Sequence, residues 1–82
     1  MIKQRSVTTQ AIELGQRLTT AREAAWLSRN ELHKRAKVGV ATISEIERGR
    51  VPNPGVYTLL KLTEILHISL LDLVEEDVAS GN

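Results

Sequence analysis

The sequence predicts an all-α domain of five short helices around an aliphatic core. Apolar residues recur at steps of three and four along most of the 82-residue chain, which is the spacing of one helix face. Two segments, at Ser28 and Ser69, begin with the serine and acidic spacing of a capping box. No segment alternates between apolar and polar residues as a half-buried strand does. A chain of this length forms one domain.

The first predicted helix follows Thr8 or Thr9, either of which can cap its N-terminus. Gly15 lies within this helix at a cost in helix propensity, so we expect another backbone to come close there. The buried stripe of the helix consists of Ala11, Leu14, Leu18, Ala21 and Ala25.

The second and third predicted helices lie close together in the sequence. Ser28 and Glu31 form an S-x-x-E capping box, which starts the second helix. A tight turn at residues 37–39 follows, with Val38 directed into the core. The third helix covers residues 40–48, and its inward side chains are Ile43 and Ile46. Gly49 is placed to end it in a left-handed conformation.

The fourth predicted helix begins with Asn53 as its N-cap and Pro54 in its first turn. Its buried stripe consists of Val56, Leu59, Leu62, Thr63 and Leu66. Ser69 and Asp72 cap a short fifth helix. The chain is thereby divided into an N-terminal arm at residues 1–9, a helical domain at 10–75 and a flexible acidic tail at 76–82.

The composition excludes several classes of function. The chain has no Cys, so it has no disulfide and no thiolate metal site. His33 and His67 are too isolated to bind a metal, and no nucleophile has a general base near it. We therefore expect no enzyme activity and no cofactor. The longest apolar run, residues 65–71, is too short to span a bilayer, and we expect a cytoplasmic protein without a membrane partner.

Charge is distributed unevenly. Residues 29–50 hold six basic and three acidic side chains, whereas residues 51–82 hold one basic and five acidic ones. The positive charge therefore lies on the second and third predicted helices. Two short helices joined by a tight turn have the layout of a helix-turn-helix, in which the second helix enters the DNA major groove. A partner that is double-stranded DNA fits both observations. The alternative explanation of the charge distribution alone is ordinary solvated surface charge.

One set of residues between Leu14 and Val74 has a distinctive order and spacing. It consists of Leu14-Gly15-x-x-Leu18, Arg22, Leu27-Ser28, Glu31-Leu32, Val38-x-x-x-Thr42-Ile43-Ser44-x-Ile46-Glu47-x-Gly49, Pro54, Thr58-Leu59, Leu62, Leu66, Ser69-Leu70 and Leu73. In this order and spacing the residues resemble the lambda-repressor-like (Cro/repressor, XRE) DNA-binding family. The resemblance implies a compact five-helix domain with a helix-turn-helix.

The resemblance implies that the third helix contacts base edges through Val40, Ala41, Thr42, Ser44 and Glu45. Apolar groups of this kind can touch a thymine methyl, hydroxyls can bond to a base or a phosphate, and Glu45 can accept from cytosine N4. The alternative is that Val40 and Ala41 only form the first helical turn and pack against the domain.

Four basic residues are placed to bind phosphates, namely Arg29, Lys37, Arg48 and Arg50. Arg29 stands where the family usually has a Gln that binds phosphate and braces the third helix. Lys37 replaces the usual turn Gly, and Gly39 replaces a capping Ser or Thr. This exchange suggests that the special backbone conformation of the turn has moved by two residues.

The resemblance also implies a structural ion pair between Arg22 and Glu47, which would fix the first helix against the third. Trp26 and His33 are departures from the family, which has small residues at these places. Neither implies a different chemistry.

Leu71 stands where the family is usually polar, and with Leu70 and Val74 it makes the last helix apolar on more than one side. We therefore expect a homodimer through these residues, although Leu71 could instead cover the N-terminal arm. The expected function is a dimeric repressor of a palindromic operator. The alternatives are an antitoxin, HipB-like or HigA-like, that binds a toxin protein and represses its own operon, and an adaptor that binds only protein.

Overall fold

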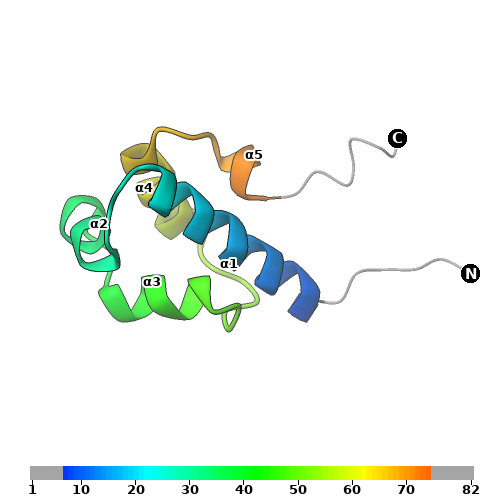
Figure 1. The fold of residues 1–82 in the computed structure, drawn as a ribbon. Coiled ribbons are helices and arrows are strands. Elements are labelled where there is room, and N and C mark those ends of the chain that lie inside the picture. Colours follow the sequence, from blue (N-terminus) through cyan, green and yellow to red (C-terminus); the bar gives the residue numbers. More distant parts are fainter. Residues whose placement is uncertain (1–6, 75–82) are drawn as a thin grey trace, which may run out of the picture.

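The structure is a computed structural model that describes residues 7–74. In this range it contains five α-helices, α1 (Val7–Ala24), α2 (Arg29–Ala36), α3 (Val40–Glu47), α4 (Val56–Leu66) and α5 (Leu70–Leu73), and no strand. The long α1 crosses the domain, with α3 on one side of it and α5 on the other (Figure 1). The short α2 packs against α3 and α4. The all-α fold with five helices is therefore as predicted.

The core is aliphatic and is formed by every helix. It contains Leu14, Leu18, Leu27, Leu32, Ala36, Val38, Ile43, Ile46, Leu59, Leu62, Leu66 and Leu73. The two aromatic side chains take no part in it, because Trp26 is 91% exposed and Tyr57 is 78% exposed. No helix within residues 7–74 has the length and apolar character that crossing a membrane requires.

Gly15 allows α1 and α3 to touch. A Cβ atom at this position would lie 2.4 Å from the carbonyl oxygen of Ile46 and 2.5 Å from that of Glu47. Only a residue without a Cβ permits this approach. The expectation that another backbone comes close to Gly15 is confirmed.

Both predicted capping boxes are present. The Ser28 hydroxyl accepts from the Glu31 N–H at 3.0 Å, while the Glu31 carboxylate accepts from the Ser28 N–H at 2.8 Å. Ser69 and Asp72 repeat the arrangement at the start of α5, at 3.3 Å and 2.8 Å. These bonds satisfy N–H groups that no helical carbonyl can reach.

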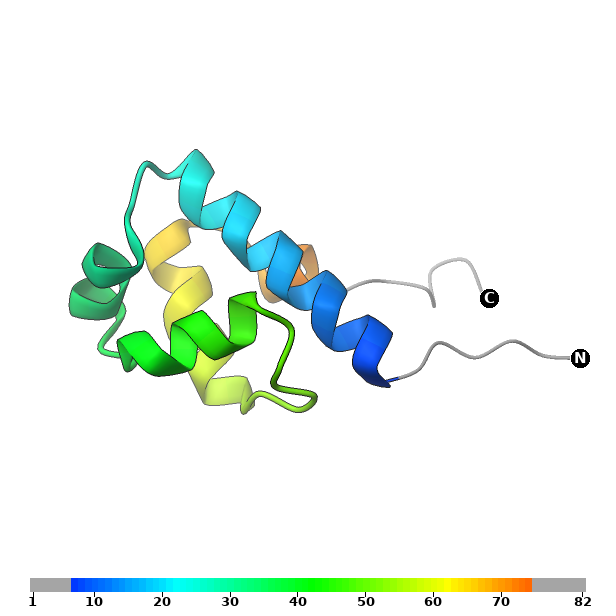
Figure 2. The same ribbon diagram turned by 60° about the horizontal axis from the view of Figure 1, so that its bottom comes forward.

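Two predicted helix starts are wrong. The first helix begins at Val7 rather than after Thr8 or Thr9. The fourth helix begins at Val56 with Gly55 as its N-cap, so Asn53 and Pro54 belong to the preceding loop. Val56 is accordingly 55% exposed instead of buried. The loop swings away from the end of α3 before it returns to α4, and this path uses the residues assigned to the helix (Figure 2).

The predicted movement of the turn conformation is also wrong. Lys37 itself adopts the left-handed conformation, with φ 59°, whereas Gly39 has an ordinary φ of −54°. Trp26 and His67 also have positive φ, and they follow the ends of α1 and α4. The helices α1, α2 and α4 are thus each followed by a residue other than glycine in the left-handed conformation, which glycine adopts more readily. Gly49, with φ 75°, ends α3 as predicted.

Part of the predicted domain division concerns residues outside the described range. The arm at residues 1–9 is described only from Val7, which lies in α1. The tail at 76–82 is wholly outside the described residues.

Candidate nucleic-acid interface

In Figure 2 the third helix lies in front of α4, and no other described helix lies on its outer side. Its inward side chains, Ile43, Ile46 and Glu47, are buried. Its five candidate base-contacting residues are all accessible, with Ser44 and Glu45 half exposed and Val40, Ala41 and Thr42 more so. Val40 retains 41% of its surface, so it packs only partly against the domain.

One buried carboxylate connects three helices. Glu47 of α3 accepts from Arg22 of α1 at 2.7 Å and 3.2 Å, and from Arg29 of α2 at 2.7 Å. Its side chain is 1% exposed. Arg22 also donates to the carbonyl of Leu27 at 2.8 Å, which ties the turn between α1 and α2 to the same group. The orientation of α3 is therefore fixed by hydrogen bonds from both helices that precede it.

The electrostatics of this group follow from its contacts. Burial raises the pKa of Glu47, but hydrogen bonds from Arg22 and Arg29 and their positive charges outweigh it, so the pKa lies below its ordinary value of 4.5. The hydrogen bond to Glu47 is the main reason that the pKa of Arg22 is raised. Both groups stay charged at neutral pH.

Arg29 was predicted to bind a phosphate, but its side chain also contacts another helix of the domain. Its Nε atom binds Glu47, so it braces α3 as the Gln of the resembling family does. Its side chain is still 36% exposed at the N-terminus of α2. Arg29 thus combines a structural contact with a positively charged surface.

The other three basic candidates differ in their surroundings. Lys37 and Arg48 are exposed, and their side chains make no ion pair with any residue between 7 and 74. Arg50 donates to the Glu45 carboxylate at 3.2 Å. Sequence reasoning missed this pair, since neither periodicity nor a motif relates residues 45 and 50.

His33 supports the turn between α2 and α3. Its Nδ1 lies 2.8 Å from the carbonyl oxygen of Val38, and because a carbonyl only accepts, Nδ1 carries the proton and donates. This bond closes the segment that holds Lys37 in its left-handed conformation. It explains why a histidine occupies a position where the resemblance suggests a small residue.

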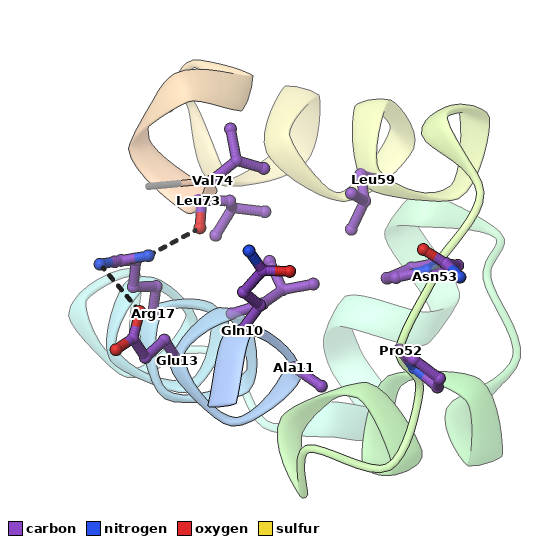
Figure 3. Close-up of a pocket in the computed structure, with 11 residues that line it drawn as sticks. Gln10, Ala11, Glu13, Arg17, Pro52, Asn53, Leu59, Leu73 and Val74 are labelled. Atoms are coloured by element: carbon purple, nitrogen blue, oxygen red, sulfur yellow. Dashed lines mark hydrogen bonds and ion pairs between the residues drawn. The ribbon is translucent and has the colours of Figure 1, made fainter. Parts of the chain in front are cut away.

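The fifth helix has one side in the core and one side exposed. Leu70 packs against the core, whereas Leu71 is 67% exposed. Val74 is half buried and lines a cavity of about 270 Å³ between α1, α4, α5 and the 52–54 loop (Figure 3). Arg17 stands beside the cavity and donates to the Leu73 carbonyl at 3.4 Å, which joins α1 to α5.

The arrangement contains the parts of a DNA-contacting surface. Residues 7–74 contain no group of three side chains that could hold a metal ion. The accessible helix α3 is instead flanked by exposed basic side chains. A small helical domain with this surface is a helix-turn-helix domain.

Comparisons with known proteins also identify a helix-turn-helix domain. A family model described as "Helix-turn-helix domain" matches residues 13–76. The chain is 30% identical to the restriction-modification controller protein C.AhdI from Aeromonas hydrophila, with a TM-score of 0.72, over 77% of this chain and 94% of that one. It is 33% identical to the N-terminal DNA-binding domain of SinR from Bacillus subtilis, with a TM-score of 0.74, over 78% and 93% of the two chains. No curated protein matches the chain significantly.

The chain therefore belongs to the XRE, or lambda-repressor-like, family of helix-turn-helix DNA-binding proteins. This family consists of transcription regulators and not of enzymes. The transcription factor NHTF from Neisseria, described as hypothetical, has the same fold with a TM-score of 0.76 over 98% of this chain and 91% of that one, at 16% identity.

Proposed function

We propose that this protein is a dimeric transcriptional repressor that places α3 in the major groove of a palindromic operator. The accessible face of α3, held by Glu47 against α1 and α2, carries the proposal. An α-helix with its side chains is about 10–12 Å in diameter, so α3 fits the width of the major groove. Val40, Ala41, Thr42, Ser44 and Glu45 would then face base edges.

The proposed phosphate contacts surround this helix. Lys37 precedes α3, and Arg48 follows it, so their charges would meet the backbone on either side of the groove. Arg29 would contribute the exposed part of its guanidinium at the start of α2, where N–H groups also favour an anion.

The proposed dimer forms through Leu71. A leucine exposed over 67% of its surface is unfavourable on a monomer, and burying such a side chain contributes about 1.5–3 kcal/mol. Leu70 and Val74 are already partly buried and would form the base of the interface. Two copies related by a twofold axis would place their α3 helices in half-sites about 34 Å apart.

Leu71→Glu should therefore convert the dimer to a monomer, because it would bury two unpaired carboxylates face to face. Sedimentation velocity would measure the change. Asn30→Glu adds the same charge at an exposed position of α2, which packs mainly against α3 and α4, and should leave the dimer intact. A Leu71→Glu protein that sediments as the wild type would show that the dimer, if any, uses another surface.

The function itself is tested by selecting duplexes from a random DNA pool with the purified protein. An enriched inverted repeat supports the dimeric repressor. The antitoxin alternative predicts that duplexes are selected only when a toxin protein is added. No observation specifically favours it. The adaptor alternative predicts no duplex binding at any salt concentration, whereas phosphate contacts give a salt slope of about −0.9 per neutralised charge.

Lys37→Gly should raise the stability of the domain and lower its affinity for DNA. Glycine relieves the left-handed strain at φ 59°, so the free energy of unfolding should rise by about 1 kcal/mol. Loss of the ammonium group should lower DNA affinity and make the salt slope shallower by about 0.9. His67→Gly is the matched control, since His67 has φ 57° at the end of α4 and should gain stability alone. Unchanged DNA affinity of Lys37→Gly would remove Lys37 from the phosphate contacts.

A further inference from the structure

The end of α3 holds Arg50 directly over Glu45. The Gly49 N–H donates to the carbonyl of Ile46 at 3.0 Å, and the Arg50 N–H donates to the carbonyl of Glu45 at 3.0 Å. These two bonds, with Gly49 at φ 75°, make a Schellman motif. In this motif the second residue after the cap returns to the last turn of the helix, so the backbone itself brings residues 45 and 50 together.

The side chains of these two residues also meet. The Arg50 guanidinium donates from Nη1 to Glu45 Oε2 at 3.2 Å. A Schellman motif often has an apolar contact between the corresponding residues. In this chain a charge pair occupies that place, and it lies at the accessible face of α3, with side chains 43% and 61% exposed.

The turn that carries Arg50 is held in place by its packing against α1. A Cβ at Gly49 would lie 2.9 Å from Ile12 Cγ1 and 3.0 Å from Ile12 Cα, so the turn packs directly on the α1 backbone. The same α1 contacts α3 through Gly15. The backbone that carries Arg50 is thus fixed relative to the helix that carries Glu45.

A carboxylate facing the major groove has a restricted choice of partners. Phosphates and the acceptor atoms of guanine and thymine repel it, and only the exocyclic amino groups of cytosine and adenine can donate to it. The neighbouring guanidinium offsets the negative charge and holds one carboxylate oxygen. The other oxygen has no hydrogen-bond partner among residues 7–74 and is left to accept from a base.

We propose that Arg50 is a positioning residue for base selection, which aims the Glu45 carboxylate at an amino group of cytosine or adenine, rather than a phosphate contact. This proposal rests on the proposed function, because it assumes that α3 lies in the major groove. Arg48 provides the contrast. It lies two residues before Arg50, it is exposed, and its side chain forms no ion pair within the described part of the chain.

The experiment measures the affinities of the selected operator and of each of its single-base variants. The proteins are the wild type, Glu45→Gln, Arg50→Gln, the double variant and Arg48→Gln. Glu45→Gln and Arg50→Gln should reduce discrimination at the same base pair, by about fivefold or more. The double variant should discriminate no worse there than Glu45→Gln alone, since both changes remove one interaction.

Two controls exclude a merely structural effect. Arg50→Lys keeps a cationic donor and should restore part of the discrimination that Arg50→Gln loses. Arg48→Gln should weaken binding to all sequences by the same factor, because a phosphate contact carries no sequence information. Circular dichroism of the helices should be the same for all variants.

The outcomes separate the two proposals. If Arg50→Gln lowers affinity equally for every sequence, as Arg48→Gln does, Arg50 is a phosphate contact and the positioning role is overturned while the repressor function stands. The positioning role is also overturned if Arg50→Gln leaves discrimination unchanged. If the wild type selects no sequence from the pool, the proposed function is overturned and the positioning role with it.

Discussion

Gly15→Ala should remove about 3 kcal/mol or more from the free energy of unfolding. The new methyl group would lie 2.4 Å from the Ile46 carbonyl oxygen and 2.9 Å from the Glu47 carbonyl carbon. Both are backbone atoms of α3, so no side-chain rotation can relieve the contact. The two helices must move apart, and a domain of this size is stable by only about 4–12 kcal/mol.

Urea unfolding followed by circular dichroism would measure the loss. Gly55→Ser is the matched control, because its Cβ would meet only Thr58 Oγ1 at 4.0 Å and its hydroxyl could cap α4. That variant should be as stable as the wild type or more so. A Gly15→Ala protein of wild-type stability would mean that the backbones of α1 and α3 are not in close contact at this glycine.

Glu47→Gln should be comparably damaging, at about 3 kcal/mol. The side chain keeps its shape but loses the charge that Arg22 and Arg29 face, and Arg22 is only 11% exposed. An uncompensated guanidinium at this depth is costly, whereas the more exposed Arg29 can turn toward water. Arg29→Ala should therefore destabilise the domain less than Glu47→Gln does, in the same urea experiment.

The acid dependence of stability gives an independent check. Because the pKa of Glu47 is depressed in the folded state, its contribution is present above pH 4.5 and is lost as the pH falls through the folded value. Glu47→Gln should flatten this loss below pH 4.5. Part of the loss should remain, because hydrogen bonds from the Ser28 backbone and side chain also lower the pKa of Glu31. If the stability of Glu47→Gln fell below pH 4.5 as steeply as that of the wild type, Glu47 would not be the cause of this acid dependence.

Local signals in the sequence predicted local structure well. The Ser28 and Ser69 capping boxes depend on residues three apart, and Gly15 marked a close approach because nothing else justifies glycine in a helix. Asn53 and Pro54 were misleading, since the same residues suit a loop as well as a helix start. The path of the loop between α3 and α4, which depends on the whole fold, decided between the two.

Among the contacts between distant segments, the Arg22–Glu47 pair was expected only because the chain resembles a known family, and two others were not predicted. The brace from Arg29 to Glu47 joins residues 18 apart, and only the packing of α2 on α3 creates it. The pair of Arg50 with Glu45 requires the left-handed turn at Gly49. Glycine at that place was predicted, but the resulting position of the next side chain was not, because a cap does not specify side-chain partners.

The exposure of Trp26 has a practical consequence for spectroscopy. The only tryptophan of the chain is already surrounded by water in the folded state, at 91% exposure, and Tyr57 is nearly as open. Intrinsic fluorescence will therefore change little when the domain unfolds. It will change instead when a molecule covers the turn between α1 and α2. A fluorescence titration can therefore detect binding at this turn, although it is nearly insensitive to unfolding.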